Sequence, residues 1–130
     1  MHMYAWRVTH PQEHRDPDHP LDQDEAGELA DIAALLATAS RVRLLFALLD
    51  GERTVDELAR HLGMEQPAVS HQLRVLRQGR LVRVRRAGRH AHYRLFDHHV
   101  PDLLAALRHH REHLGLPISS PAEHRETTAS

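Results

Sequence analysis

Two pairs of metal-binding side chains occupy opposite ends of one predicted helix near the C-terminal end of the chain. Asp97 and His99 stand at its start, and the helix is predicted to run from Asp97, as the N-cap, to about Leu114. His110 and His113 lie three residues apart near its end, so they are neighbours on one face. Three imidazoles and one carboxylate suit a tetrahedral Zn²⁺, and the same donors accept Co²⁺ or Ni²⁺ if further ligands join.

These donors cannot all reach one ion within a single chain. His99 and His110 are 11 residues apart, which is about 16 Å along a helix axis at 1.5 Å per residue. Because 11 residues make almost three whole turns, both side chains point the same way, on a seam that they share with Leu103 and Ala106. Two such helices packed antiparallel about a two-fold axis would bring the start of one beside the end of the other. Symmetry then gives two sites per dimer.

The composition of the chain restricts the chemistry further. The 130 residues include 14 histidines and no cysteine, and all 17 basic residues are arginine, against 18 acids. This length fits one small domain. Without cysteine the chain cannot form a disulfide scaffold, a zinc ribbon, an iron–sulfur cluster or a thiol nucleophile. The apolar runs fall short of the roughly 20 residues that cross a bilayer, and no secretory signal is visible, so we expect a cytoplasmic protein without a membrane partner.

The net charge of −1 conceals two oppositely charged segments. Residues 10–31 carry eight acids and one arginine, whereas residues 74–94 carry eight arginines and no acid. A solvated surface normally mixes the two signs. The arginine-rich segment is therefore a candidate site for a polyanion.

One folded domain, residues 21–115, is predicted between two tails. Residues 1–20 are rich in proline, histidine and aspartate and lack apolar periodicity, and residues 116–130 have the same character, so both are predicted to be flexible. Apolar residues at helical spacing indicate the first helix of the domain: Leu29, Ile32, Ala33 and Leu36. A second helix is predicted with Ser40 as its N-cap and an end at Asp50-Gly51.

Two further helices follow, each marked by local signals. Thr54 is predicted to cap the first of them, with Glu57 completing a capping box and Gly63 ending the helix. The second is predicted over residues 66–78, with Pro67 in its first turn.

A β-hairpin is predicted after Gly79, which closes the helix before it. Alternation with period two indicates strands over residues 81–86 and 90–96, joined by a turn at residues 87–89. The inward side chains of the hairpin are expected to be Val82, Val84 and Leu95. The predicted fold class is therefore mainly α with a β-hairpin wing.

A short helix pair with a tight turn, followed by an arginine-rich hairpin, is the winged helix-turn-helix arrangement. The outward side chains of the helix over residues 66–78 can reach base edges or phosphates in the major groove of double-stranded DNA. They are Gln66, Ser70, His71, Arg74 and Arg77. The hairpin is predicted to place four arginines near its tip for backbone or minor-groove contacts. These are Arg83, Arg85, Arg86 and Arg89. The alternative is a helical core element with a basic rim.

These motifs resemble the winged-helix core of the ArsR/SmtB family of metal-responsive repressors. The resemblance covers roughly residues 26–114, and its most specific parts are Val69-Ser70-His71-Gln72-Leu73 and the wing segment Gly88-Arg89…Tyr93-Arg94-Leu95. It implies a homodimer joined through the first and last helices. It also implies that the protein represses transcription by binding a palindromic operator and leaves the operator when metal binds. The genes that it controls would serve metal efflux or homeostasis.

The resemblance also bears on the metal. Family members with a site on the last helix use an Asp-x-His at its start and a His-x-x-His or His-x-x-Glu about 11 residues later, and this chain fills those positions with Asp97, His99, His110 and His113. The family's other common site uses cysteines on the third helix. Residues 54–58 contain none, which excludes sensing of arsenic, cadmium or lead through thiolates.

The choice between zinc and nickel or cobalt depends on the tails. In the family that this chain resembles, members that sense nickel or cobalt add ligands from flexible termini to reach six-coordination. The resemblance therefore implies that the tails of this chain could supply such ligands. Candidates for that role are the α-amino group of Met1, the imidazole of His2 and His124; alternatively, the tail histidines take no part. We favour nickel or cobalt in the cell, with zinc binding well in vitro.

Three other functions are compatible with the residues. The run His109-His110-Arg111-Glu112-His113 matches the H-x-x-E-H pattern of inverted zincins, but a zinc metallohydrolase needs a third ligand further along and a cleft. A regulator of the same fold could be activated by metal or ignore it, which a gel shift with and without metal distinguishes. A metal buffer that binds DNA incidentally would show a steep salt dependence without preference for a palindrome.

Overall fold

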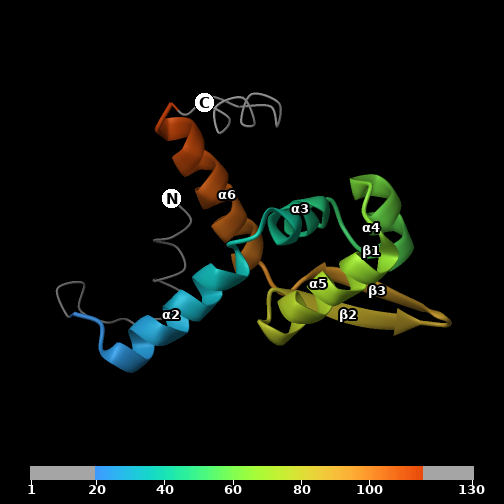
Figure 1. Ribbon diagram of the computed structural model, residues 1–130, viewed down its shortest axis with the longest axis horizontal. Helices are drawn as coiled ribbons and strands as arrows, with labels where there is room; N and C mark the ends of the chain where they lie inside the picture. Colours follow the sequence, from blue (N-terminus) through green and yellow to red (C-terminus); the bar gives the residue numbers. More distant parts are fainter. Residues whose placement is uncertain (1–19, 116–130) are drawn as a thin grey trace, which may run out of the picture.

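The computed structural model describes residues 20–115, which form a mainly helical fold with one small sheet (Figure 1). In chain order the elements are α2 (Gln23–Leu35), α3 (Ala39–Ala47), β1 (Arg53–Thr54), α4 (Val55–Leu62), α5 (Gln66–Gln78), β2 (Val82–Ala87), β3 (His90–Leu95) and α6 (His99–His113). The predicted fold class is confirmed. The segments predicted to be flexible tails lie outside the described residues, apart from Pro20.

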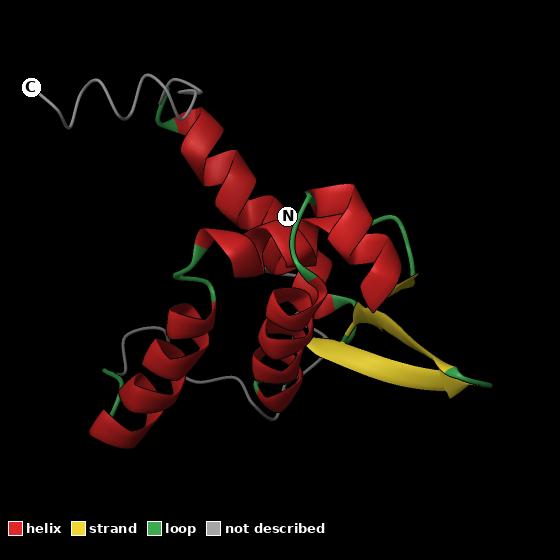
Figure 2. Cartoon of the chain, turned by 45° about the vertical axis from the view of Figure 1, so that its right-hand side comes forward, coloured by secondary structure: helices red, strands yellow, loops and turns green. Residues whose placement is uncertain are grey.

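The sheet is antiparallel and has three strands in the order β1-β3-β2. The predicted hairpin forms, with Val82 paired to Leu95 at its base and Ala87 paired to His90 at its tip. Figure 2 shows this wing projecting from the helices. Strand β1 was not predicted, because two residues are too few to show a period of two.

The core lies under the helix-turn-helix unit, where α3, α4 and α5 pack together and meet the base of the wing and the start of α6. Its fully buried side chains are Leu44, Leu45, Leu58, Val69, Leu73, Leu76, Val82 and Leu104. The inward apolar positions of α5 are three of these. The opposite face of α5 is therefore left to solvent, as a DNA-reading helix requires.

Local signals placed most helix ends correctly. Thr54 and Glu57 form the predicted capping box, Gly63 ends α4 with a left-handed φ of 65°, and α5 spans the predicted residues with Pro67 in its first turn. The prediction of Ser40 as an N-cap was wrong: α3 starts at Ala39, and Thr38 holds the cap position without a side-chain hydrogen bond.

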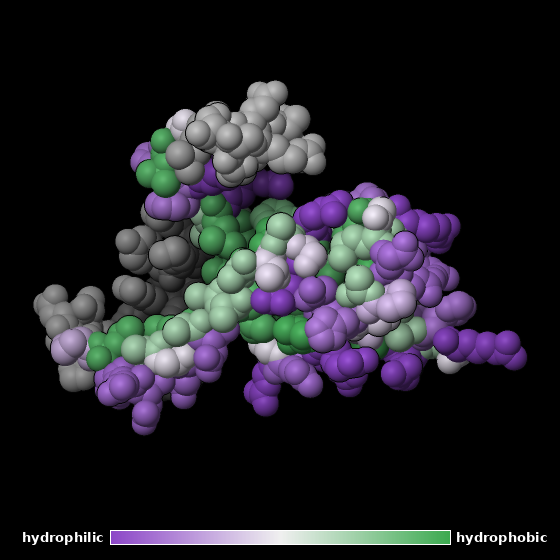
Figure 3. Space-filling model, in the orientation of Figure 1, coloured by the Kyte–Doolittle hydropathy of each residue, from purple (hydrophilic) through white to green (hydrophobic). Residues whose placement is uncertain are grey.

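The arms α2 and α6 extend from the body in different directions (Figures 1 and 2). No residue of α2 is buried, and its Leu29 and Ile32 are 49% and 42% exposed. On α6, Leu107 is 42% exposed. Figure 3 shows apolar surface along α2 and near the base of α6. These arms therefore leave apolar faces uncovered in one protomer. Within residues 20–115, no helix combines the length and apolar character that a membrane crossing requires.

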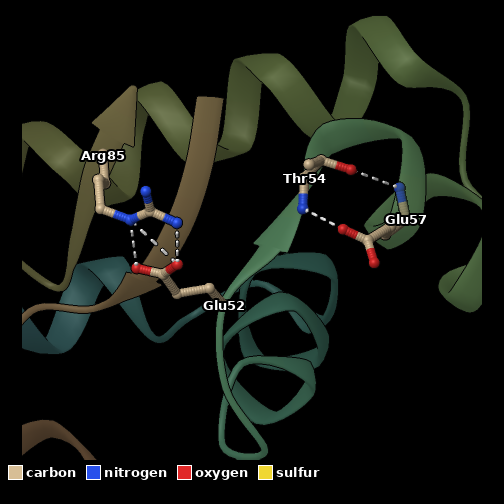
Figure 4. Close-up of polar contacts among 4 residues, drawn as sticks. All are labelled: Glu52, Thr54, Glu57 and Arg85. Atoms are coloured by element: carbon tan, nitrogen blue, oxygen red, sulfur yellow. Dashed lines mark hydrogen bonds and ion pairs between the residues drawn. The ribbon is translucent and has the colours of Figure 1, made fainter. Parts of the chain in front are cut away.

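The capping box of α4 contains a carboxylate with a shifted pKa (Figure 4). The Thr54 backbone N–H donates to Glu57 Oε1 at 2.9 Å, and the Glu57 backbone N–H donates to Thr54 Oγ1 at 3.2 Å. Hydrogen bonds from the Thr54 backbone and side chain hold the pKa of Glu57 below its ordinary value. A carboxyl of this kind stabilises the fold above its unfolded pKa, and the contribution is lost as the pH falls through the folded pKa.

We therefore expect the penalty of Glu57→Ala on the free energy of unfolding to be full near neutral pH and to disappear at a pH well below about 4. Urea unfolding of both proteins across this range measures the difference. Asp56→Ala is the matched control, since its side chain takes no part in the capping box. A Glu57→Ala penalty that stays constant with pH would contradict the role assigned to the carboxylate.

Candidate metal centre and nucleic-acid interface

The start of α6 brings Asp97 and His99 together. Asp97 Oδ1 accepts a hydrogen bond from the His99 backbone N–H at 3.0 Å, and Asp97 Oδ2 lies 3.4 Å from His99 Nδ1. The prediction of Asp97 as N-cap was wrong by one residue, because His98 holds that position in helical conformation. The Asp97 carboxylate nevertheless satisfies a backbone donor of the first turn, which fixes it beside the imidazole.

Two opposing effects act on the pKa of Asp97. Partial burial raises it, but the hydrogen bonds from the His99 side chain and backbone, with the nearby His99 and His98 rings, outweigh burial and leave the pKa below its ordinary value. The carboxyl is thus ionised at neutral pH. An ionised oxygen beside an imidazole nitrogen is the form in which this pair binds a metal ion.

The other two predicted ligands, His110 and His113, lie exposed near the end of α6. His113 also lies near His109, with ring centroids 6.3 Å apart. Across the described part of one protomer, no group of three or more His, Cys, Asp or Glu side chains could hold a metal ion. The structure therefore keeps the two predicted pairs at opposite ends of the helix. The extra candidates Met1, His2 and His124 lie outside the described residues.

The seam that joins the two pairs is separate from the face of α6 that packs on the core. Its members are His99, Leu103, Ala106, His110 and His113. The core-facing row begins with Val100 and Leu104, which are buried. His99 directly precedes Val100, and Leu103 directly precedes Leu104. The seam is therefore rotated by about 100° about the helix axis from the core-facing row. Leu103 and Ala106 are half-buried, and His110 and His113 are exposed. A second helix therefore has access to the later part of this seam, whereas His99 Nε2 is buried within the protomer.

On α5, the predicted DNA-reading helix, the predicted contact residues lie outside the buried row. Gln66, His71, Arg74 and Arg77 are exposed, and Ser70 is half-buried. Pro67 in the first turn has no N–H of its own that would need a partner there. The exposed face can therefore offer two arginines, an imidazole and an amide to a groove. Contact with DNA stays a prediction for each of these residues.

The wing arginines differ in what holds them. Arg85 makes a two-pronged ion pair with Glu52, from Nη2 to Oε1 at 2.8 Å and from Nε to both carboxylate oxygens at 3.2 Å (Figure 4). This pair raises the pKa of Arg85 and lowers the pKa of Glu52, in each case first through the side-chain hydrogen bond. Arg85 is thereby tied to the turn before β1, and a role in placing the wing competes with the predicted role in binding DNA.

Arg83 is also held within the protein. Its guanidinium lies 4.3 Å from the centroid of the Phe96 ring. In the strand register, Arg83 of β2 stands opposite Arg94 of β3, near the base of the hairpin. The prediction that Arg83 lies near the tip was therefore wrong, since six-residue strands separate base from tip. Arg86 and Arg89 stand nearest the turn and are exposed. They are the arginines best placed for a phosphate.

Sequence reasoning missed two residues that shape this interface, Glu52 and Arg41. Glu52 lies in the short loop before β1 and meets Arg85 only because β1 pairs with β3. Arg41 donates to the end of α2 and to Gln72 on α5. No spacing rule connects residues 31 or 33 positions apart, so neither contact had a signal in the sequence.

Comparison with known proteins identifies the family. A family model described as "Bacterial regulatory protein, arsR family" matches residues 38–84, from the start of α3 into β2. The HTH-type transcriptional regulator NmtR of Mycobacterium tuberculosis is 48% identical over 103 residues, which cover 79% of this chain and 86% of that protein. The chain belongs to the arsR family. Because this is a family of transcriptional regulators, the arsR assignment excludes the metallohydrolase alternative.

Three solved structures share the fold. The solution structure of apo-NmtR has a TM-score of 0.65 at 46% identity and covers 83% of this chain and 91% of its own. The crystal structure of the AntR antimony-specific transcriptional repressor has a TM-score of 0.68 at 36% identity, covering 78% and 93%. A homodimeric winged helix-turn-helix DNA-binding domain from Mycobacterium bovis has a TM-score of 0.65 at 30% identity, covering 72% and 89%. The winged helix-turn-helix prediction is confirmed.

Proposed function

We propose that this arsR-family protein is a homodimeric repressor that binds a palindromic operator in the cytoplasm and leaves it when Ni(II), Co(II) or Zn(II) binds. The observation that carries the proposal is the Asp97–His99 pair at the start of α6, with His99 on the same side of the helix as the exposed His110 and His113. Its regulated genes would serve metal efflux or homeostasis.

The dimer would form through α2 and α6. Both helices leave apolar side chains exposed, including Leu29, Ile32 and Leu107. Burying such surface stabilises an interface by roughly 25 cal/mol per Å² before the costs of association. The relative from M. bovis is described as homodimeric, which supports the same assembly for this chain.

Each metal site would combine two protomers. Asp97 and His99 of one protomer would bind together with the partner's His110 and His113, so two-fold symmetry gives two sites. The donor set fits, because an ionised carboxylate and three imidazoles complete a tetrahedral site. Ligands from Met1, His2 or His124 would extend it towards six-coordination and favour nickel or cobalt.

The DNA-reading surface would consist of the exposed face of α5 in the major groove and the wing beside the backbone. In a dimer the two α5 helices must match half-sites about 34 Å apart. A bound ion would cross-link the two α6 helices and fix their relative angle. The chain's own part is to couple that angle to the α5 spacing, so that the metal-bound form fits the operator poorly. The AntR relative, described as an antimony-specific repressor, supports repression that responds to an inorganic ion.

Operator affinity measured with and without metal tests the proposal. The probe is a DNA duplex selected from a random-sequence pool by the metal-free protein. We expect Ni²⁺, Co²⁺ or Zn²⁺ to weaken binding by about 5- to 150-fold, the usual range of allosteric coupling. Unchanged affinity with all three metals would reject metal sensing, and tighter binding would establish a metal-activated regulator instead. A selection that yields no palindrome would favour a metal buffer.

A further inference from the structure

The C-terminal end of α2 is joined to the DNA-reading helix by one arginine. Arg41 donates from Nε to the Leu35 carbonyl at 2.8 Å and from Nη2 to the Ala34 carbonyl at 3.0 Å. Its Nη1 donates to Gln72 Oε1 on α5 at 3.2 Å. The planar guanidinium therefore holds the last turn of α2 and the middle of α5 in one rigid fork.

A second contact joins the same two helices. The side chain of Leu35 packs over Gly79 at the end of α5: a Cβ on Gly79 would overlap Leu35 Cδ1 and lie 3.2 Å from its Cγ and Cδ2. Gly79 has an ordinary φ of −81°, and the left-handed residue of this turn is Arg80, with a φ of 60°. Glycine at position 79 thus makes room for Leu35 and is not required by the backbone.

Other arginines close helix ends without reaching α5. Arg43 donates to the Leu62 carbonyl at the end of α4, at 2.8 Å, and Arg53 donates to the Ala47 carbonyl at the end of α3, at 3.0 Å. Each satisfies a carbonyl that the helix itself leaves without a donor. Of these three arginines, Arg41 is the one that also donates to the DNA-reading helix.

We infer that Arg41, supported by the Leu35–Gly79 contact, is a positioning residue that transmits the geometry of the dimer interface to α5. No residue of α2 is buried, so we expect the orientation of α2 to depend on the partner that packs on its apolar face. The hydrogen bonds of Arg41 connect the C-terminal end of α2 to the rest of the protomer. The inference rests on the proposed dimer and metal response. A change in the angle between the dimer helices would then move Gln72, and with it the α5 face that carries Ser70 and His71.

The first test compares operator affinity with and without metal for Arg41→Lys. A lysine keeps the charge but cannot hold two α2 carbonyls and Gln72 in one plane. We expect metal to weaken operator binding by less than about twofold in this variant, against about 5- to 150-fold in the wild type. The affinity of the DNA-free protein for metal should stay at the wild-type value. Arg43→Lys is the matched control and should keep the full metal response.

The second test reads the spacing of the α5 helices without DNA. The chain has no cysteine, so Ala68→Cys on the exposed side of α5 accepts a single spin label per protomer. In the wild-type background metal should shift the distance between the two labels, and in Arg41→Lys it should not. Gly79→Ala, which displaces Leu35, should reduce the shift as well. If Arg41→Lys does not fold, Gln72→Met removes the α5 acceptor alone and should give the same loss.

The outcomes separate the two levels of the proposal. If metal changes neither affinity nor distance in the wild type, metal sensing fails and the junction fails with it. If the wild type responds and Arg41→Lys or Gln72→Met responds equally, the repressor stands and the junction is overturned. Equal weakening of metal-free and metal-bound DNA complexes in Arg41→Lys also overturns it, because a purely structural role lowers both affinities alike.

Discussion

In the variant His110→Ala, metal should no longer release the protein from DNA. His110 supplies one of four ligands in each proposed site, and even the loss of an outer-shell partner of a metal ligand typically costs about 10- to 100-fold in metal affinity. We therefore expect affinity for Ni²⁺, Co²⁺ or Zn²⁺ to fall by about 100-fold or more, while the metal-free protein binds the selected duplex as the wild type does. Fluorescence anisotropy of labelled duplex and the absorption of bound Co²⁺ measure the two effects.

His109→Ala is the matched control, because it removes the adjacent exposed imidazole of the same helix, which lies off the seam. It should keep both metal affinity and metal response within about twofold. Equal loss in His109→Ala and His110→Ala would contradict the proposed ligand set and indicate scavenging by exposed histidines.

Mixing two inactive variants tests whether each site spans two protomers. Asp97→Ala and His110→Ala each break both sites of their own homodimer. In a mixed dimer the defects fall in the same site, which leaves the other site intact with Asp97 and His99 from the His110→Ala chain. We expect one metal per mixed dimer at wild-type affinity. If mixing restores no binding, the ligands do not come from two chains.

In the double variant Arg86→Gln and Arg89→Gln, DNA binding should weaken for every sequence alike. These exposed side chains stand nearest the wing tip and are expected to contact phosphates, which position a protein without reading bases. Each lost phosphate contact lowers the slope of log affinity against log salt by about 0.9. We expect affinity to drop by about 10- to 100-fold at moderate salt and the slope to fall by about 2.

Arg108→Gln provides the matched control, since it removes positive charge from α6, where the guanidinium lies 4.5 Å from the Phe46 ring. It should leave the salt slope unchanged. An unchanged slope in the wing variant would show that these arginines do not touch the DNA backbone. Binding to selected and random duplexes over a salt series separates this loss from a loss of base readout.

Much of the helical framework could be predicted from short stretches of sequence. The ends of α4 and α5 depend on residues within one or two turns of each other: Thr54 with Glu57, Gly63, and Pro67. Such interactions have the same partners in every fold that forms the helix. The failures at Ser40 and Asp97 were shifts of one or two residues, where neighbouring positions compete for the same free backbone donors.

The sequence alone determined which donors could bind a metal and that one helix could not gather them. Spacing on a helix fixes both the face and the separation of His99, His110 and His113, whatever the rest of the chain does, and Asp97 stands two residues before the first of them. In the same way, the alternation of the wing and the buried row of α5 determined which side chains face solvent.

Only the tertiary structure decided which arginines are held and what joins α2 to α5. The pairs Arg85–Glu52 and Arg41–Gln72 span 33 and 31 residues, and long side chains on distant segments follow no period. Gly79 shows the difference clearly: it reads as a helix stop, but its φ is ordinary and Leu35 occupies the space a side chain would need. Local propensity acts through neighbours in the chain, whereas these contacts exist only once packing has brought separate elements together.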